Sequence, residues 1–478
     1  MSRNVSLIVL IVVIGGIILA PLKIIGYGYL PFDDAFRHSA KAVSGKDWSE
    51  ILVLRPEVRM DNHVGWHAIL GLIYRFTGWD TEGLVVFSVV SLFLFFCLLP
   101  VFLLRRPEAW LCALLVIVLA NSMLFCRLLL GRPYIVTMSF LLVLCFLWPK
   151  LKNKNIPFGT TALFVILTAL VTWIHGSWYL LIIPVLSFFL AREFRAGILF
   201  AASTVLGILL GAIMTGHPYL FLKQNMIHLF LSLGGYKLTR MLVVEFQPFT
   251  GDVMAVLAVI IMLMWRKLRG AWNRKTIDNP VFILAATGWA LGFLVQRFWF
   301  DWGLPALLVW IAFEFQDYLK KSMKSYSPRR LFMAVIVTAV FYLAVTADVN
   351  SRWTYKLTTE YLSLEDKEEA EWLPEPGGIV YSDDMRVFYD TFFKNPKAPW
   401  RYILGFEAAL MPPEDLAIFR SIQWNGGAYG SFEPWVKKMR RPDRLILKRP
   451  SGEEPKIPGI EWHYAATDTW IGRLPKTR

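Results

Sequence analysis

The sequence has few charged residues and few cysteines. Charged residues make up 18% of its 478 residues, against about a quarter in an ordinary soluble protein. The four cysteines all lie in apolar stretches, so neither a disulfide framework nor a CxxC metal site is expected. Hydrophobic residues reach 56%, and the mean hydropathy is +0.48. This composition excludes a disordered chain, a collagen and a disulfide-rich secreted scaffold, and it predicts a polytopic membrane protein.

The net charge of +14 would suit nucleic-acid binding until the charges are located along the chain. Residues 350–478 contain 19 basic and 19 acidic side chains, which cancel. The positive excess therefore lies in the apolar part of the chain, where basic loops report membrane topology. A nucleic-acid partner is not expected.

About eleven apolar runs precede residue 347. Each is predicted to form a transmembrane helix, which needs ~20 residues including its interfacial ends. The runs are Val5–Leu19, Leu84–Leu104, Ala109–Phe125, Tyr134–Trp148, Phe158–Trp173, Trp178–Leu190, Ile198–Met214, Val253–Trp265, Val281–Val295, Leu304–Phe313 and Leu331–Val345. Several runs are shorter than a full span, so the predicted boundaries are loose.

Basic loops predict that the N-terminus is cytoplasmic. With that orientation every cytoplasmic loop is basic, including the loop with Lys150, Lys152 and Lys154. The first run lacks a clear small-residue cleavage site, so we interpret it as a retained helix and not as a signal peptide. The chain is therefore expected to be a multi-pass integral membrane protein whose C-terminal domain is extracytoplasmic, in the periplasm, the extracellular space or the ER lumen.

Two domains follow from this topology. Residues 1–347 would form an all-α transmembrane domain with long outer loops at 21–82 and 215–252, and residues 348–478 a small α/β soluble domain. Long loops tend to be functional. Within these outer segments, short amphipathic helices are predicted at Ala35–Val43 and His67–Phe76, strands at Gly378–Tyr381 and Arg444–Leu447, and a helix at Pro413–Ser421.

The first long loop contains two adjacent carboxylates, Asp33 and Asp34, about ten residues past the outer end of the predicted first helix. Adjacent acids raise one another's pKa unless a cation or a shared proton is present. At a membrane face such a pair suits proton removal from a hydroxyl nucleophile, or the binding of a divalent metal beside a phosphate. The alternative is a solvated turn in which an aspartate caps the helix that follows.

A second motif in this loop contains His63 and His67. Two histidines four residues apart share a helix face and suit zinc binding. However, Val64 stands where an HExxH motif has glutamate, so a metalloprotease is not supported. The alternative is an interfacial helix start, and Trp66 is interpreted as interfacial in preference to sugar-stacking.

Several cations lie in or beside the predicted outer turns. Arginine binds phosphate bidentately, so at least one of them is expected to contact a lipid phosphate, and interface anchoring would explain the others. The candidates for binding substrate or lipid phosphate are Arg37, His63, His67, Arg132, His175, Lys223, Arg240 and Arg297, and Arg127, His228 and Lys237 belong to the same outer-face set.

With these features the chain resembles the GT-C superfamily of polytopic glycosyltransferases, which includes protein O-mannosyltransferases, aminoarabinose transferases and oligosaccharyltransferase catalytic subunits. The resemblance consists of a long outer loop after the first helix, an acidic pair early in that loop, a second outer loop after about seven helices and an outer C-terminal domain. Phe32-Asp33-x-x-Phe36 is similar to a Phe-Asp-x-x-Phe motif of oligosaccharyltransferase subunits. Asp-Asp replaces the Asp-Glu that is usual in O-mannosyltransferases.

The resemblance implies a fold, an activity and a site. Asp33 corresponds to the family's catalytic aspartate and Asp34 to its acidic companion, which leaves open which of them is the base and whether a divalent metal, Mg or Mn, is held there. The donor would be a polyprenyl-phosphate-linked sugar. The acceptor, a protein, a glycan or a lipid, would be glycosylated at the extracytoplasmic face in one inverting step.

Two other functions are compatible with a membrane protein of this composition. A transporter or flippase of lipid-linked sugars would be expected to carry internal repeats and polar residues at the membrane midplane, and the sequence has neither feature. A non-enzymatic membrane scaffold would leave the long first loop unexplained.

Overall fold

The structure is a computed structural model that describes residues 2–121, 123–151, 157–234, 236–449, 452–465 and 468–475. Lys152 and Lys154, which the topology prediction uses, lie outside these residues. The chain divides into two compact units. The first unit comprises Met1–Tyr29, Phe87–Pro218 and Val243–Tyr355, and the second comprises Leu30–Val86, Tyr219–Leu242 and Lys356–Arg478.

All eleven predicted apolar runs coincide with helices. The run Ala109–Phe125 is divided between two helices, so twelve helices of the described residues correspond to the runs: α1 (Ser2–Ile25), α5 (Thr81–Leu103), α6 (Pro107–Ala120), α7 (Met123–Leu128), α8 (Tyr134–Leu151), α9 (Phe158–His175), α10 (Ile182–Leu190), α11 (Phe194–Ile213), α14 (Val253–Leu268), α15 (Pro280–Gly292), α17 (Leu304–Ser322) and α18 (Pro328–Thr346). The short helix α16 (Gln296–Phe298) lies outside every predicted run. A π-helical segment, η4 (Trp299–Gly303), joins α16 to α17, and a 3-10 segment, η2 (Val244–Phe246), precedes α14.

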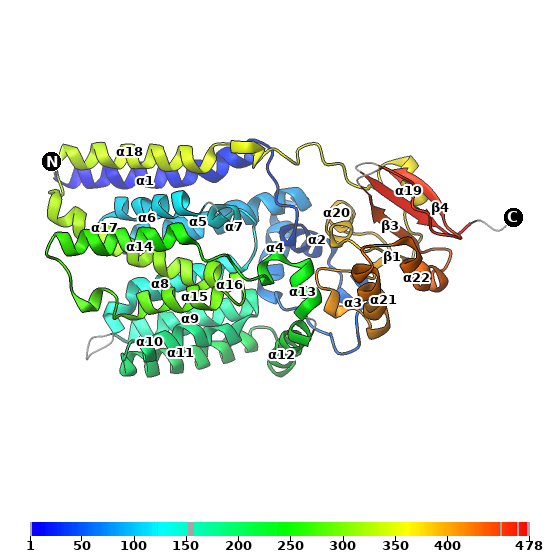
Figure 1. Ribbon diagram of the computed structural model, residues 1–478, viewed down its shortest axis with the longest axis horizontal. Coiled ribbons are helices and arrows are strands. Elements are labelled where there is room, and N and C mark those ends of the chain that lie inside the picture. The colour runs from blue at the N-terminus through cyan, green and yellow to red at the C-terminus, as the bar shows by residue number, and fades with distance from the viewer. Residues whose placement is uncertain are drawn as a thin grey trace. The chain divides into compact units, whose positions relative to one another are not determined.

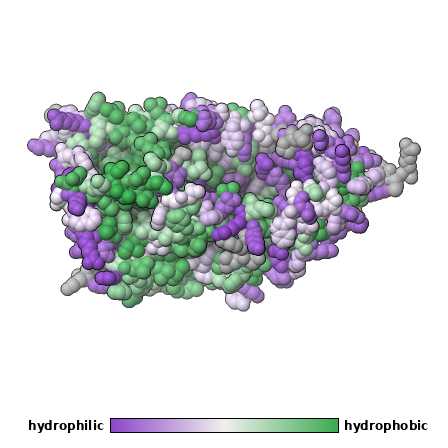
Figure 2. All heavy atoms as spheres, viewed as in Figure 1, coloured by the Kyte–Doolittle hydropathy of each residue, from purple (hydrophilic) through white to green (hydrophobic). Residues whose placement is uncertain are grey.

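Seven helices in the described part of the chain are long and apolar enough to cross a membrane. They are α1, α5, α8, α9, α11, the continuous segment Gln296–Ser322 and α18. The segments Pro107–Ala120, Trp178–Leu190 and Pro280–Gly292 are apolar but shorter. Hydrophobic side chains gather over the helices of the first unit in Figure 2. The structure thus agrees with a multi-pass membrane protein, and the predicted count of about eleven spans is not confirmed.

Close helix packing within the first unit depends on small residues. Helices α1 and α18 run side by side in Figure 1, and so do α9 and α11. A Cβ atom added to Gly207 of α11 would lie 2.5 Å from the Thr168 Cβ, and one added to Gly211 would lie 2.5 Å from the Ala169 carbonyl oxygen. Small residues at one face allow helix backbones to approach closely where lipid replaces water.

The second unit combines the two long loops with the C-terminal residues. Its helices are α2 (Asp34–Ser44), α3 (Trp48–Ile51), α4 (Val64–Thr77), α12 (Pro218–Gly234), α13 (Tyr236–Leu242), α19 (Lys367–Trp372), α20 (Met385–Lys394), α21 (Pro413–Trp424) and α22 (Glu433–Lys438). The strands are β1 (Ile379–Tyr381), β2 (Arg401–Tyr402), β3 (Arg444–Lys448), β4 (Glu461–Ala465) and β5 (Thr469–Arg473). They form one sheet in the order β2-β1-β3-β5-β4, in which β1 runs parallel to β2 and β3 while β5 is antiparallel to β3 and β4.

These elements confirm the short helices, strands and C-terminal helix predicted in the outer segments. The structure also shows what holds the first loop in place. Trp48, Ile51 and Leu52 share one hydrophobic core with Phe388 and Tyr402 of the C-terminal residues. The sequence-based division at residues 347 and 348 separates segments that the structure packs into this one core.

The α9–α11 packing generates a stability prediction. Gly207→Ala should lower the melting temperature of the purified protein in detergent, because the new methyl group clashes with Thr168 and overpacking costs about 1–3 kcal/mol. Gly15→Ala in α1 is the matched control, since a Cβ there meets nothing within 4 Å among the described residues. If the two variants have the same melting temperature, the close α9–α11 contact is refuted.

Candidate functional site

The acidic pair lies at the start of α2. Asp33 is the N-cap residue of this helix, and its Oδ1 accepts a hydrogen bond from the Ala35 amide at 3.5 Å. A carboxylate at this position also complements the positive end of the helix dipole. Phe36, one turn further on, is fully buried and stacks on Phe393 of α20 with 3.8 Å between ring centroids. The aromatic contact therefore fixes the start of α2 against the C-terminal part of the unit.

The two aspartates have different partners. Asp34 Oδ1 accepts hydrogen bonds from Arg37 Nε at 2.6 Å and from the Tyr389 hydroxyl at 3.1 Å. Arg37 is 4% exposed, and its guanidinium also lies 4.0 Å from the centroid of the Phe406 ring. Burial tends to lower the pKa of Arg37, but the charges and hydrogen bond of Asp34 and Tyr389 outweigh it and raise that pKa. Arg37, predicted to contact a lipid phosphate, is the counter-ion of Asp34, and its contact with a phosphate stays a prediction.

A partly buried lysine interacts electrostatically with Asp33. The Lys356 ammonium is 4.0 Å from the centroid of the Phe32 ring. Burial lowers the pKa of Lys356, and the charges of Asp390 and Asp33 act in the opposite direction. We call Asp33, Asp34, Arg37, Lys356 and Tyr389 the acidic cluster. It contains the Asp34–Arg37 ion pair and a second carboxylate, Asp33. The charge of Asp33 acts on the partly buried ammonium of Lys356.

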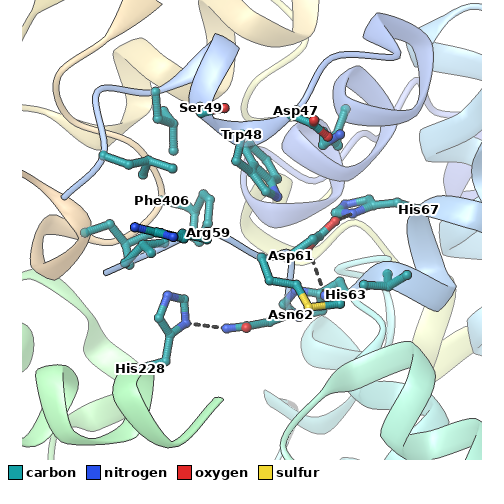
Figure 3. Close-up of a pocket in the computed structure, with 17 residues that line it drawn as sticks. Asp47, Trp48, Ser49, Arg59, Asp61, Asn62, His63, His67, His228 and Phe406 are labelled. Carbon is teal, nitrogen blue, oxygen red and sulfur yellow. Dashed lines mark hydrogen bonds and ion pairs between the residues drawn. The ribbon is translucent and has the colours of Figure 1, made fainter. Parts of the chain in front are cut away.

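A pocket of about 480 Å³ lies on the other part of the first loop (Figure 3). This volume falls within the range of roughly 300–1,000 Å³ that is usual for small-molecule sites. Lining side chains come from α2, α3, the segment before α4, α4 itself, α12 and the C-terminal residues. Those used below are Lys41, Asp47, Trp48, Arg59, Asp61, Asn62, His63, His67, His228 and Phe406, and we call this site the histidine pocket. Asp33 and Asp34 are not among its lining residues.

A chain of hydrogen bonds joins α4 to α2 at the edge of this pocket. His67 Nδ1 bonds to Asp61 Oδ2, and His67 Nε2 lies 2.8 Å from His38 Nδ1. The other Asp61 oxygen accepts the His63 amide at 2.9 Å. Burial alone would raise the pKa of Asp61, but the His67 ring and the two hydrogen bonds hold it well below its usual range. Burial lowers the pKa of His67 against the opposing charge of Asp61, so we assign an ionised Asp61 and a neutral His67.

This geometry changes the interpretation of the histidine motif. Both ring nitrogens of His67 are engaged, one by Asp61 and one by His38. The His63 and His67 ring centroids are 6.3 Å apart. Within the described ranges, no group of three or more histidine, cysteine or acidic side chains is arranged to hold a metal ion. The structure places His67 in an Asp61–His67–His38 chain that positions the loop before α4, and zinc binding by His63 and His67 stays an untested hypothesis.

Two of the arginines predicted to bind phosphate belong to a buried ion cluster in the first unit. Arg132 lies 2.6 Å from Glu245 of η2, and Arg297 lies 2.8 Å from Asp301 of η4. Arg127, from the wider set, bridges the same two acids, with 2.9 Å to Glu245 and 2.5 Å to Asp301. The cations therefore have carboxylate counter-ions, which gives a structural reason for arginine in these short loops, and their contact with a phosphate stays a prediction.

The remaining predicted ligands are dispersed. His175, at the end of α9, is buried, and its Nδ1 lies 3.0 Å from the Thr137 hydroxyl of α8. Lys223 of α12 is exposed, and Arg240 of α13 is half-buried. None of these three lines the histidine pocket. Sequence analysis missed Lys356 and Tyr389, because each acts through contacts across more than three hundred residues and neither stands in a motif.

Comparison with known proteins adds nothing to this geometry: the chain matches no protein-family model and no curated protein. The function therefore has to be argued from the site itself.

The Asp61–His67 pair generates a pH prediction. Because the pKa of His67 is lowered in the folded protein, the unfolded chain binds a proton below about pH 6.5 that the folded chain does not. Stability should therefore fall between pH 7 and pH 5, by at most about 1.4 kcal/mol per pH unit for this group. His67→Gln should melt with a shallower pH dependence over this window, whereas His217→Gln, at an exposed histidine, should match the wild type. An unchanged slope in His67→Gln would contradict the assignment of a neutral His67.

Proposed function

We propose that this chain is an integral-membrane glycosyltransferase. It moves a sugar from a polyprenyl-phosphate carrier to an acceptor hydroxyl at the extracytoplasmic face, with Asp33 as the general base. The observation that carries this proposal is the division of roles within the acidic pair, where Asp34 neutralises the buried Arg37 and Asp33 lies near Lys356.

Asp34 is a poor base in this arrangement. Its Oδ1 accepts two hydrogen bonds, one of them charge-assisted, and protonation would break the ion pair of a buried guanidinium. Asp33 accepts a longer hydrogen bond from the helix it caps, at 3.5 Å, which is at the weak limit of hydrogen bonding. Asp33 is half-buried, so part of this residue is open to an approaching acceptor hydroxyl. This supports Asp33 as the residue that takes the proton.

The cation near Asp33 supports a phosphate leaving group. A polyprenyl phosphate departs with its negative charge already spread over oxygens, so the protein has to stabilise that charge and need not protonate the leaving oxygen. Lys356 is a partly buried ammonium that interacts electrostatically with Asp33, and lysine binds phosphate as a point charge. Lys356 would therefore hold the phosphate in the reactant and steady it in the product.

The reaction is balanced without a further group. The acceptor oxygen forms a bond to the anomeric carbon as the bond from that carbon to the phosphate oxygen breaks, with inversion at the carbon. The acceptor proton passes to Asp33, and the electron pair of the broken bond stays on the polyprenyl phosphate. One carboxylate and one cation are sufficient for this step.

Separate substitution of the two acids tests the proposal. Purified full-length protein with a radiolabelled polyprenyl-phosphate sugar and an acceptor extract should transfer label, and Asp33→Asn should slow transfer by about 10²–10⁴-fold, as loss of a general base does. Asparagine still caps a helix, so Asp33→Asn should fold normally. Asp34→Asn serves as the matched comparison. It should lower the melting temperature, because Arg37 loses its counter-ion, while it retains far more turnover per folded molecule.

Two results would count against the proposal. The first is wild-type turnover in the Asp33→Asn protein, and the second is a wild-type protein that scrambles the lipid-linked sugar across liposomes without forming a glycosylated product.

A further inference from the structure

The charges that line the histidine pocket cancel. Lys41 and Arg59 supply two cations, and Asp47 and Asp61 supply two carboxylates. With the histidines counted as neutral, the pocket has no net charge. A phosphate or another anion would find no excess of cations there, so an uncharged ligand fits this lining best.

An aromatic wall supplies the apolar part of the pocket. Trp48 and Phe406 line it with 5.0 Å between their ring centroids. Figure 3 shows the Trp48 indole reaching toward the middle of the site, opposite the side chains of Asn62 and His228. A flat aromatic face beside polar groups suits a ligand that is apolar on one face and hydroxylated around its edge.

Two buried polar atoms of the pocket residues supply a matched pair of hydrogen-bonding groups. The Asn62 amide nitrogen bonds to His228 Nδ1, as the dashed line in Figure 3 marks. His228 is 9% exposed, and its Nε2 and the Asn62 Oδ1 have no partner in the described part of the chain. With the amide nitrogen donating to Nδ1, the neutral His228 ring carries its proton on Nε2, so that Nε2 is a donor and the Asn62 Oδ1 an acceptor.

That pair of atoms identifies the ligand class. Reversing the Asn62 amide exchanges the two roles and still leaves one donor and one acceptor. A hydroxyl group both donates and accepts, whereas an ionised phosphate accepts and an ammonium donates. Buried polar atoms without partners are costly, so a ligand that satisfies both of them gains specificity.

We propose that the histidine pocket binds an uncharged sugar ring, with Asn62 and His228 bonding its hydroxyls and Trp48 covering its apolar face. The role of the bound ring rests on the proposed function: it is the acceptor, so the enzyme glycosylates a glycan.

Binding of methyl glycosides to the full-length protein in nanodiscs tests this site. The probes are the methyl glycosides of glucose, mannose, galactose and N-acetylglucosamine, measured by saturation-transfer NMR, with inorganic phosphate as the anionic comparison. At least one glycoside should bind the wild type, and phosphate should not compete with it. The double variant Asn62→Leu/His228→Phe removes both polar partners together, which is nearly neutral for folding, and should weaken binding at least tenfold. His217→Phe, at an exposed histidine, should bind like the wild type.

Steady-state transfer then separates this inference from the proposed function. The double variant should raise the KM for the glycan acceptor at least tenfold and change the KM for the polyprenyl-phosphate sugar less than twofold. A raised donor KM, no binding of any of the four glycosides, or equal binding by the double variant would overturn the pocket assignment. Variant-sensitive glycoside binding in a protein that shows no transfer would leave the pocket in place and reject the transferase.

Discussion

The buried guanidinium of Arg37 is the constraint on which the second unit depends. An unpaired buried charge would be strongly destabilising, so Arg37 requires a carboxylate, and Asp34 supplies it at 2.6 Å. The same guanidinium lies against Phe406, which lines the histidine pocket. Arg37 thus holds Asp34 in a structural ion pair. Its contact with Phe406 connects the acidic cluster to the wall of the histidine pocket. The proposal that Asp33 is the general base rests on this pairing of Asp34 with Arg37.

Buried charged side chains in the first unit are likewise paired with side chains of opposite charge. Glu108, at the start of α6, is fully buried, and its two oxygens accept hydrogen bonds from Arg330 of α18 at 2.6 and 3.0 Å. Arg127 is likewise enclosed between Glu245 and Asp301, the latter on the π-helical segment η4. Pairing of this kind allows a helix bundle with an apolar surface to keep charges in its interior, since removing either partner would leave the other one buried and uncompensated.

Local physical rules predicted the elements of this protein well. Hydrophobic runs located the apolar helices, although they did not separate α6 from α7, and local strand and helix signals located β1, β3 and α21. Asp33 before an amphipathic pattern predicted the capped helix α2. Those rules act within a few residues along the chain, which is why they succeed for helices and short strands.

The contacts that could not be predicted join residues that are far apart in the sequence. Tyr389 bonds to Asp34 across 355 positions, and Glu245 pairs with Arg127 across 118. The sequence therefore did not indicate the carboxylates that pair with Arg127, Arg132 and Arg297, or the bonds from His67 to Asp61 and His38. The acidic pair could be found from sequence as a candidate, but the proposed division into a structural Asp34 and a catalytic Asp33 depends on the packing of Arg37 and on Lys356.

The most direct test of that division is an experimental structure of the full chain with a non-transferable polyprenyl-phosphonate sugar bound. The account predicts the phosphonate beside Lys356 and the anomeric carbon facing Asp33, with room for one hydroxyl oxygen between them at roughly 3 Å from each. A head group bound away from Asp33, with that carboxylate facing open solvent, would contradict it.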